Sequence, residues 1–398
     1  MFQNIIKVCS VFLMLFLTFR CAPKAENTNY LVTEIEAVKN QFAPDKRVAL
    51  FAIDAEKRGE SYVLKGESNL PDAVIALKNS LKAAEINFLD SIQLLPGADL
   101  KDKTMGLVTI SVANLRSNPK HSAELATQAT LGTPVKIYKN DGSWSLIQTP
   151  DNYLSWVDNA GIQAITPTEF ETWKETSKII YTKIYGSTYS APNTNSQVIS
   201  DIVAGSILTL LSEENEFFRV EYPDKRVAYV NKAEAKLYEA WLSQTSPTEE
   251  NLVTTSKQLM GLPYLWGGTS TKGVDCSGYT KIIYFLNGII LPRDASQQIH
   301  TGELMDENQN FENLAPGDLL FFGKKVTDST AERVIHVGMW IGNNEFIHSS
   351  GQVRVSSVDK NAMNYDEYNL NRYLRTKRVI NSKTGALINL TRTPVFTN

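Results

Sequence analysis

An internal repeat in the middle of the chain is the strongest constraint on its fold. Proline, glycine, aspartate, valine and aromatic landmarks recur after a constant interval of 73 positions. The pairs are Pro119 and Pro192, Gly132 and Gly205, Trp144 and Phe217, Pro150 and Pro223, Asp151 and Asp224, Trp156 and Tyr229, and Val157 and Val230. Between them, short β-branched runs alternate with turn sequences such as Asn-Asp-Gly-Ser143, a pattern typical of a small antiparallel barrel. The chain is therefore expected to carry two such barrels in tandem.

Length and composition predict a multidomain protein with cores of ordinary size. The 398 residues are 42% hydrophobic, which suggests about three domains. The net charge of −3 offers no basic footprint, so we expect no nucleic-acid partner, because nothing would neutralise the phosphates.

The first 21 residues predict export. Lys7 precedes a short apolar run that suits a signal peptide and is too short to span a bilayer comfortably. Cys21 resembles the cleavage site of a lipoprotein, where it would carry a lipid anchor, although Arg20 departs from the small residue normal at that place. Ordinary cleavage nearby and an uncleaved anchor are the alternatives. We expect an exported monomer, either periplasmic or a membrane-anchored lipoprotein.

The segment before the barrels predicts a small α+β domain without recognisable chemistry. One helical face is traced by Leu31, Ile35, Val38 and Phe42. Two strand-like runs, Arg47–Asp54 and Ser61–Lys65, follow as a hairpin, and a second helix begins at Pro71. We expect this domain to act in packing or as a spacer.

The segment from Gly261 to Gly278 places one cysteine at a helix start behind a glycine-rich, aromatic approach. Asp275 is suited to cap the helix, and Cys276 falls in its first turn. The apolar positions that follow at helical spacing are Tyr279, Ile282, Ile283 and Leu286. The unpaired amides of the first turn favour thiolate over thiol, which predicts a nucleophile. Taken singly, such a cysteine is more often a small buried hydrophobe.

A thiolate nucleophile needs a base and a group that orients the base, and two of the four histidines fit. His336 and His348 lie in two strand-like runs joined by a Gly-Asn-Asn turn, so a hairpin would bring both imidazoles to one face. His121 and His300 are expected at the surface. Zinc is excluded because one cysteine and two histidines lack any paired ligand motif. We expect neither a metal nor another cofactor.

Together these residues resemble the NlpC-type family of bacterial cell-wall cysteine peptidases, whose papain-like fold packs helices on an antiparallel sheet. The resemblance runs from about Leu252 to Arg378. Its landmarks are Tyr264-Leu-Trp-Gly-Gly268, Asp275-Cys-Ser-Gly278, Leu291-Pro-Arg-Asp-Ala-Ser-Gln297, Pro316-Gly-Asp-Leu319 and His336-Val-Gly338. The resemblance implies that Cys276 is the nucleophile, His336 the general base and acid, and His348 the orienting third residue. The two repeat copies similarly resemble bacterial SH3-like barrels.

Family members that open with two barrels resemble dipeptidyl-peptidase VI, which cuts between γ-D-glutamate and a diamino acid in peptidoglycan stem peptides. That resemblance implies that the substrate's free amino end is held by Asp275, Ser277 and Ser296. It also implies that an acidic and a tyrosine side chain of the first barrel contact the amine, for which Glu124 and Tyr153 are the best matches. The alternative is that Glu124 is solvated and Tyr153 packs in the barrel core.

Two aromatic residues of the approach segment are further candidates. Tyr264 and Trp266 would line the cleft, with the Tyr264 hydroxyl near the oxyanion, although aromatics before a helix are commonly core residues. Arg293 and Asp294 are expected to form a structural ion pair. Asp318, after a Pro-Gly turn, is expected to shape the entry of a strand.

The predicted architecture is a multidomain α+β protein. Its parts are a leader at 1–21, a small α+β domain at 27–105, a first SH3-like barrel at 106–165, a second at 178–240 and a papain-like α+β catalytic domain at 250–398. The expected substrates are L-Ala-γ-D-Glu-diamino acid peptides. An endopeptidase of intact peptidoglycan and a non-catalytic wall-binding lipoprotein are the alternatives. The preferred diamino acid, the lipidation of Cys21 and the membrane face are left open by the sequence.

Overall fold

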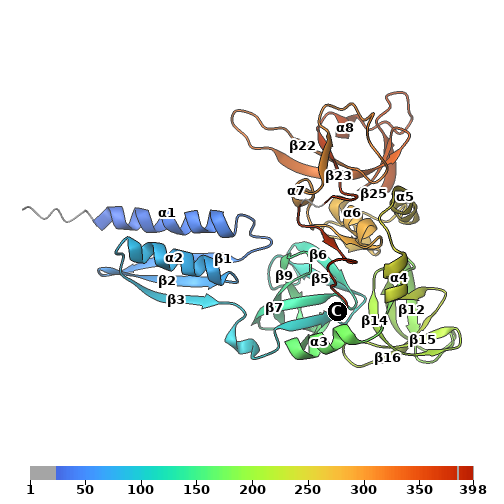
Figure 1. The fold of residues 1–398 in the computed structure, drawn as a ribbon, viewed down its shortest axis with the longest axis horizontal. Coiled ribbons are helices and arrows are strands. Elements are labelled where there is room, and N and C mark those ends of the chain that lie inside the picture. Colours follow the sequence, from blue (N-terminus) through green and yellow to red (C-terminus); the bar gives the residue numbers. More distant parts are fainter. Residues whose placement is uncertain (1–23, 383–384, 398) are drawn as a thin grey trace, which may run out of the picture.

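A computed structural model describes residues 24–382 and 385–397, and the predicted leader with Cys21 lies outside them. Three groups of elements follow one another along the chain: a small N-terminal domain, two barrels and a C-terminal domain (Figure 1). None of the helices in the described ranges is both long and apolar enough to cross a membrane.

The N-terminal domain is a three-stranded sheet covered by two helices. Its elements are α1 (Lys24–Phe42), β1 (Phe51–Arg58), β2 (Ser61–Ser68), α2 (Pro71–Ala83) and β3 (Phe88–Leu94). The first two strands form the expected hairpin, and β3 pairs parallel to β2, which requires α2 as the crossover. The predicted helical faces supply the core, since Leu31, Leu77 and Leu81 are almost fully buried.

Two seven-stranded barrels confirm the fold predicted from the repeat. The first contains β4 (Met105–Val108), β5 (Val112–Arg116), β6 (Leu125–Thr130), β7 (Pro134–Asp141), β8 (Trp144–Gln148), β9 (Leu154–Asp158) and β10 (Ile162–Ile165). The second contains β11 (Lys178–Tyr181), β12 (Tyr185–Tyr189), β13 (Val198–Val203), β14 (Ile207–Glu214), β15 (Phe217–Glu221), β16 (Val227–Asn231) and β17 (Ala235–Leu237). Every strand of the second barrel begins 73 residues after its counterpart. The 3-10 turns η1 (Ala98–Leu100) and η2 (Asn159–Gly161) and the helices α3 (Pro167–Glu175) and α4 (Tyr238–Gln244) complete this region.

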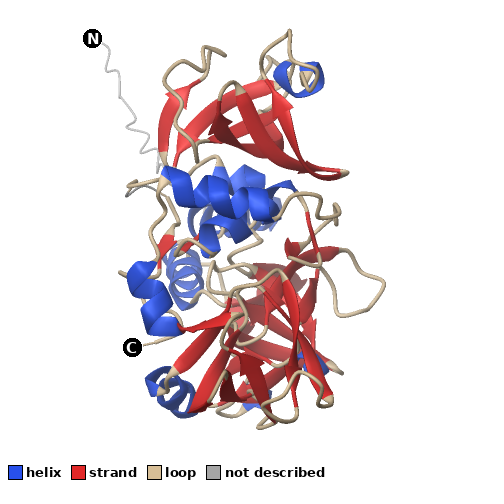
Figure 2. Ribbon diagram, turned by 90° about the vertical axis from the view of Figure 1, so that its right-hand side faces the viewer, coloured by secondary structure: helices blue, strands red, loops and turns tan. Residues whose placement is uncertain are grey.

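The C-terminal domain packs helices on an antiparallel sheet, as the resemblance implied. The sheet order is β21 (Glu303–Asp306), β26 (Tyr373–Arg378), β22 (Leu319–Lys324), β23 (Arg333–Gly342), β24 (Glu345–Ser350) and β25 (Gln352–Ser357). The helices are α5 (Glu249–Gln258), α6 (Cys276–Phe285), α7 (Ala295–Gln298) and α8 (Glu367–Leu370), and short pairs are formed by β18 (Thr269–Ser270) with β19 (Gly273–Val274) and β20 (Ile289–Ile290) with β27 (Ile388–Asn389). Helices of this domain lie between its sheet and the two barrels (Figure 2).

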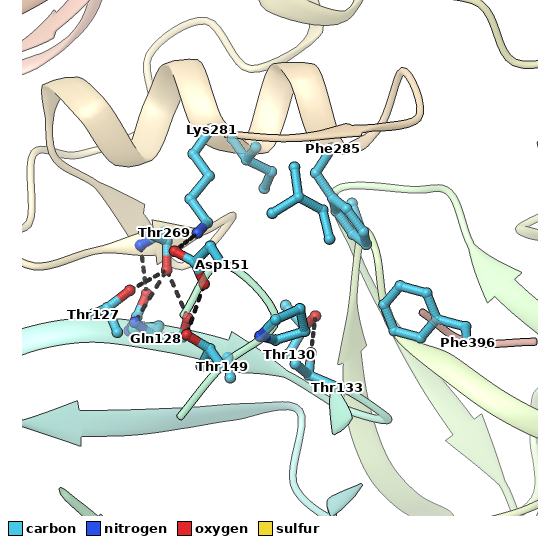
Figure 3. Close-up of a pocket in the computed structure, with 15 residues that line it drawn as sticks. Thr127, Gln128, Thr130, Thr133, Thr149, Asp151, Thr269, Lys281, Phe285 and Phe396 are labelled. Atoms are coloured by element: carbon cyan, nitrogen blue, oxygen red, sulfur yellow. Dashed lines mark hydrogen bonds and ion pairs between the residues drawn. The ribbon is translucent and has the colours of Figure 1, made fainter. Parts of the chain in front are cut away.

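Helix α6 is fixed to the first barrel by a buried ion pair. Lys281 reaches from α6 to the carboxylate of Asp151, whose side chain is only 4% exposed (Figure 3). The other oxygen of this carboxylate accepts a hydrogen bond from Thr149 at 2.7 Å. Lys281 follows Cys276 by five positions, which is about 140° around a helix, so the pair is on the side away from the nucleophile. One helix thus presents its nucleophile to the sheet and its lysine to the barrel.

Candidate active site

The start of α6 is held in place by the residue before the nucleophile. Asp275 is the N-cap, and its Oδ1 accepts a hydrogen bond from the Gly278 amide at 2.7 Å. Gly278 lies against the approach segment so closely that a Cβ there would come within 1.9 Å of the carbonyl oxygen of Gly268. The Asp-Cys-Ser-Gly sequence therefore serves both the cap and this close packing.

Arg293 completes the support of the helix start. It is 1% exposed, its Nη2 lies 2.6 Å from Asp275 Oδ2, and its Nη1 donates to Ser277 Oγ at 3.0 Å. The expected ion pair with Asp294 is present but long, at 3.9 Å. The nearer partner of the buried guanidinium is the cap carboxylate of Asp275, which the sequence did not indicate. Asp275 also accepts from the Gly267 amide, so its carboxylate is largely occupied by partners within the protein.

The two predicted histidines meet across the hairpin of β23 and β24. These strands pair antiparallel, with Trp340 opposite Phe346, which confirms the hairpin. His336 Nε2 lies 2.7 Å from His348 Nδ1, and the two side chains come from residues that are 7% and 0% exposed. Because His336 Nε2 is hydrogen-bonded to His348, Nδ1 is the nitrogen available to exchange a proton with the nucleophile and the substrate.

The nucleophile lies beside the strand that carries His336. The backbone amide of Val337, the next residue on β23, hydrogen-bonds to the sulfur of Cys276. Cys276 and Val337 also belong to the same buried core. Cys276 keeps 8% of its surface exposed, so it is at the edge of this core. The fold therefore brings Cys276 and His336 from distant parts of the sequence to adjoining elements.

Burial acts against the ionised sulfur that the helix start was expected to favour. Burial raises the pKa of the Cys276 thiol to about 12, with a further increase from the charge of Asp275, and the amides of Val337 and Ser277 offset only part of this. Burial also lowers the pKa of His336 well below its usual range. Desolvation thus opposes the thiolate that the helix start was expected to favour. Both shifts favour a neutral thiol beside a neutral imidazole.

The buried histidines predict that acid destabilises the fold. Burial lowers the pKa of His348 to about 4, whereas an unfolded histidine titrates near 6.5. Below pH 6.5, His348 binds a proton in the unfolded state but stays neutral in the folded state. The free energy of unfolding therefore falls as the pH drops from about 6.5 towards 4. For His348 alone, the free energy of unfolding should fall by roughly 2 kcal/mol between pH 7 and pH 5.

Urea unfolding at the two pH values measures this loss. The difference between pH 7 and pH 5 should shrink in His348→Gln and stay at the wild-type size in His121→Gln, because the His121 side chain is 79% exposed. An equal pH dependence in wild type and His348→Gln would contradict the prediction.

The first barrel packs against the segment that precedes the nucleophile. Trp266 donates its indole N–H to Glu124 Oε1 at 2.7 Å, which joins two of the predicted binding residues across the domain boundary. Gly267 has a φ of +80°, and a Cβ there would come within 2.1 Å of the Leu125 carbonyl oxygen. Thr269 and Gln128 exchange further hydrogen bonds. Trp266 nevertheless stays 64% exposed, so this contact forms an open rim.

Tyr264 is close to the reacting sulfur. Burial raises the pKa of its hydroxyl to about 12, and the charges that act on it in the same direction belong to Cys276 and Asp275. The hydroxyl therefore stays protonated at neutral pH and is available as a hydrogen-bond donor. Among the predicted cleft aromatics, Tyr264 is half-buried beside the nucleophile and Trp266 is at the rim.

Tyr153 and Ser296 lie around Asp294, which adjoins the buried Arg293, and the N-terminal domain completes this cluster. Tyr153 donates to Asp294 Oδ2 at 3.1 Å, and burial raises the pKa of its hydroxyl. Arg47, in the loop between α1 and β1, donates to Asp294 Oδ2 and to Ser296 Oγ, both at 2.8 Å. Arg47 is itself held by Asp45 through two bonds of 2.8 Å. The N-terminal domain thus touches the catalytic domain at a predicted binding residue, a role that the sequence did not reveal.

Two polar residues behind His348 were also missed by the sequence analysis. His348 Nε2 lies 3.0 Å from Ser356 Oγ and 3.8 Å from Asp366 Oδ2. Ser356 could have been found, because the hairpin register places it on the same face as His348. Asp366 belongs to an irregular segment and carries no periodic signal.

Comparisons with known proteins assign the domains. The NlpC/P60 family matches residues 261–372, the bacterial dipeptidyl-peptidase Sh3 domain matches 115–162, and the bacterial SH3 domain matches 189–235. A solved structure of an NlpC/P60 family protein from Bacillus cereus superposes with a TM-score of 0.59 at 26% identity, covering 69% of this chain and 99% of that one.

Two curated relatives extend the similarity across the barrels and the catalytic domain. The gamma-D-glutamyl-L-lysine dipeptidyl-peptidase of Bacillus cereus is 33% identical over 253 residues, covering 61% of this chain and 73% of the relative. Dipeptidyl-peptidase 6 of Lysinibacillus sphaericus is 27% identical over 267 residues, covering 64% and 92%. The chain therefore belongs to the NlpC/P60 family of cell-wall peptidases and is a cysteine peptidase.

Proposed function

We propose that this peptidase hydrolyses the γ-D-glutamyl–diamino acid bond of peptidoglycan stem peptides whose N-terminal L-Ala is free. The observation that carries the proposal is the contact between the first barrel and the nucleophile segment, where Glu124 meets Trp266. A barrel packed at this place limits how far a peptide extends beyond the reacting carbonyl. Released peptides fit such a cleft, which suggests a role in murein peptide recycling.

The residues beside the nucleophile support the following chemistry. The sulfur of Cys276 attacks the amide carbonyl while His336 Nδ1 takes the thiol proton, so that charge develops only as the bond forms. Backbone amides at the start of α6 and the Tyr264 hydroxyl would hold the oxyanion. His336 then returns the proton to the leaving amine, and water hydrolyses the acyl-enzyme with His336 as base. This sequence begins from the neutral pair described above.

We propose that the amine of L-Ala binds between the barrel and the catalytic domain. In the described part of the chain, Glu124 accepts the one hydrogen bond from Trp266, which leaves its second oxygen for an ammonium. The Tyr153 hydroxyl oxygen adds an acceptor, and Ser277 and Ser296 are proposed to contribute hydroxyls. Asp275 is proposed to act mainly through its charge, because its oxygens already accept from Arg293 and backbone amides.

A peptide digest tests the proposed reaction. Incubation with L-Ala-γ-D-Glu-diamino acid tripeptides should give L-Ala-D-Glu and the free diamino acid, identified by mass. Parallel digests with L-Lys and with meso-diaminopimelate would show which diamino acid is preferred. Absence of cleavage, or products from another bond, would refute the proposed specificity.

Two further proposals concern location and an alternative substrate. The relatives' names and the apolar start of the chain support export to the periplasm or anchoring at Cys21, and mass analysis of the mature N-terminus would reveal the lipid.

The second barrel, matched by the bacterial SH3 domain, favours action on intact peptidoglycan as the second candidate. Digestion of purified sacculi distinguishes it from the recycling role.

A further inference from the structure

A chain of polar groups continues beyond the two histidines and ends at a carboxylate. His348 Nε2 lies 3.0 Å from Ser356 Oγ and 3.8 Å from Asp366 Oδ2, so a hydroxyl and a carboxylate both face this nitrogen. At 3.8 Å, Asp366 is too far from His348 Nε2 for a direct hydrogen bond and acts on it through its charge. His348, Ser356 and Asp366 are 0%, 4% and 9% exposed, so bulk water scarcely competes for these groups.

The proposed reaction requires one particular arrangement of protons along this chain. To accept the thiol proton at Nδ1, His336 must carry its own hydrogen on Nε2. That hydrogen is donated to His348 Nδ1, which must then be the acceptor, so the hydrogen of His348 is on Nε2. His348 in turn donates to Ser356 Oγ, and the negative charge of Asp366 beside Nε2 favours a hydrogen on that nitrogen. The carboxylate thus favours the one direction of the chain that the reaction requires.

We propose that Ser356 and Asp366 are positioning residues that fix the tautomers of His348 and His336 through this chain of polar groups. The proposal rests on the proposed roles of Cys276 and His336 and extends them by two residues. Without the charge of Asp366, a hydrogen on His348 Nε2 is no longer favoured, and the Ser356 hydroxyl is free to donate to that nitrogen. His348 would then hold its hydrogen on Nδ1 and donate it to His336 Nε2. His336 would carry its hydrogen on Nδ1, the nitrogen that has to receive the thiol proton.

Strand pairing and helix capping fix the positions of Ser356 and Asp366. Ser356 pairs with Phe346 in the β24–β25 register, which sets it two places from Arg354, the partner of His348. Asp366 caps α8 through the Asn369 amide at 3.0 Å, and its own amide donates to the Ser357 carbonyl oxygen at 3.0 Å. Neighbouring charges also bear on the pair, because Arg354 and Arg372 disfavour a charged His348 and Asp366 favours one. Asp366 is thus the acidic group that offsets two nearby cations when an imidazolium forms.

Substitutions that leave the local fold intact test this role. Asp366→Asn keeps a side chain that caps helices well and removes the charge. We expect kcat on the tripeptide to fall by about 10²-fold with KM little changed, since removing an orienting carboxylate in direct contact with a catalytic histidine costs about 10⁴-fold and Asp366 is 3.8 Å from His348, one histidine further from the chemistry. Ser356→Ala should lower kcat similarly, and Ser356→Thr, which restores a hydroxyl, should recover part of it.

The matched control is Ser357→Ala. Ser357 is the next residue on β25, is equally buried, and bonds through its hydroxyl to Asn344 and Asp359 instead of a histidine. Its kcat should equal that of the wild type. A wild-type kcat in folded Asp366→Asn would overturn the inference while leaving the proposed function in place.

Nitrogen-15 NMR of the imidazoles provides a readout that does not depend on activity. The wild type should show hydrogen on Nε2 of both His336 and His348, and Asp366→Asn should shift His336 towards the Nδ1–H tautomer. Hydrogen on Nδ1 of His336 in the wild type would refute the inference, whatever the enzyme cleaves.

Discussion

Cys276→Ala is expected to lower kcat on the tripeptide by roughly 10⁴-fold or more, because removal of a covalent nucleophile leaves only binding and oxyanion stabilisation. The substitution deletes a single sulfur at the edge of the core, so the fold should persist. Steady-state kinetics measure the loss, and circular dichroism with urea unfolding verifies the fold. Turnover equal to that of the wild type would place the nucleophile elsewhere.

Alkylation is a less direct test of the same residue. Because burial raises the pKa of Cys276 to about 12, the free thiol is expected to react slowly with iodoacetamide at neutral pH. Slow alkylation would therefore not indicate a decayed enzyme. Accumulation of an acyl-enzyme at Cys276, detected by mass after rapid quenching, reports the nucleophile during turnover.

N-acetylation of the tripeptide is expected to lower kcat/KM by about 10²-fold, the second large effect. Acetylation removes the ammonium charge that Glu124 is proposed to bind, and a charged partner lost from a partly desolvated pair costs about 2–3 kcal/mol. The acetyl group also extends the peptide towards the barrel wall. Parallel kinetics on the free and acetylated peptides measure the discrimination.

Glu124→Gln identifies the residue responsible for that discrimination. The variant should lose most of its kcat/KM on the free peptide and little on the acetylated one, so the ratio between the two substrates shrinks. Asp141→Asn is the control, since Asp141 is an exposed carboxylate of the same barrel at the end of β7. If the wild type cleaves both peptides equally, the enzyme does not recognise the free amine of the substrate. Action on intact peptidoglycan then becomes the better proposal.

Local sequence patterns predicted much of this fold. The recurrence at 73 residues predicted two barrels because turn and core residues repeat with the supersecondary unit. The runs around His336 and His348 predicted a hairpin because strand alternation and an Asn-Asn turn are local signals. The nucleophile helix was likewise visible from its cap and apolar spacing.

Features that depend on tertiary contacts were not predictable in the same way. The ionisation of Cys276 is decided by how much protein surrounds it, which no helix-start pattern reports. Asp366 is held near His348 by its cap on α8 and by a backbone hydrogen bond to Ser357, and neither contact can be predicted from a periodic pattern. Arg47 acts across three domains, and its partners Asp294 and Ser296 lie about 250 positions later in the chain.

The ion pair between Lys281 and Asp151 makes the first barrel an integral part of the catalytic unit. Lys281 is on the same helix as Cys276, and burial lowers its pKa while Asp151 supplies the compensating charge. A buried cation that loses its partner typically costs about 3–5 kcal/mol. Exchange of this barrel for an unrelated wall-targeting module during evolution would therefore leave Lys281 without its partner, about 1.4 helical turns from the nucleophile. Lineages that shuffle these modules would have to change Lys281 in the same step.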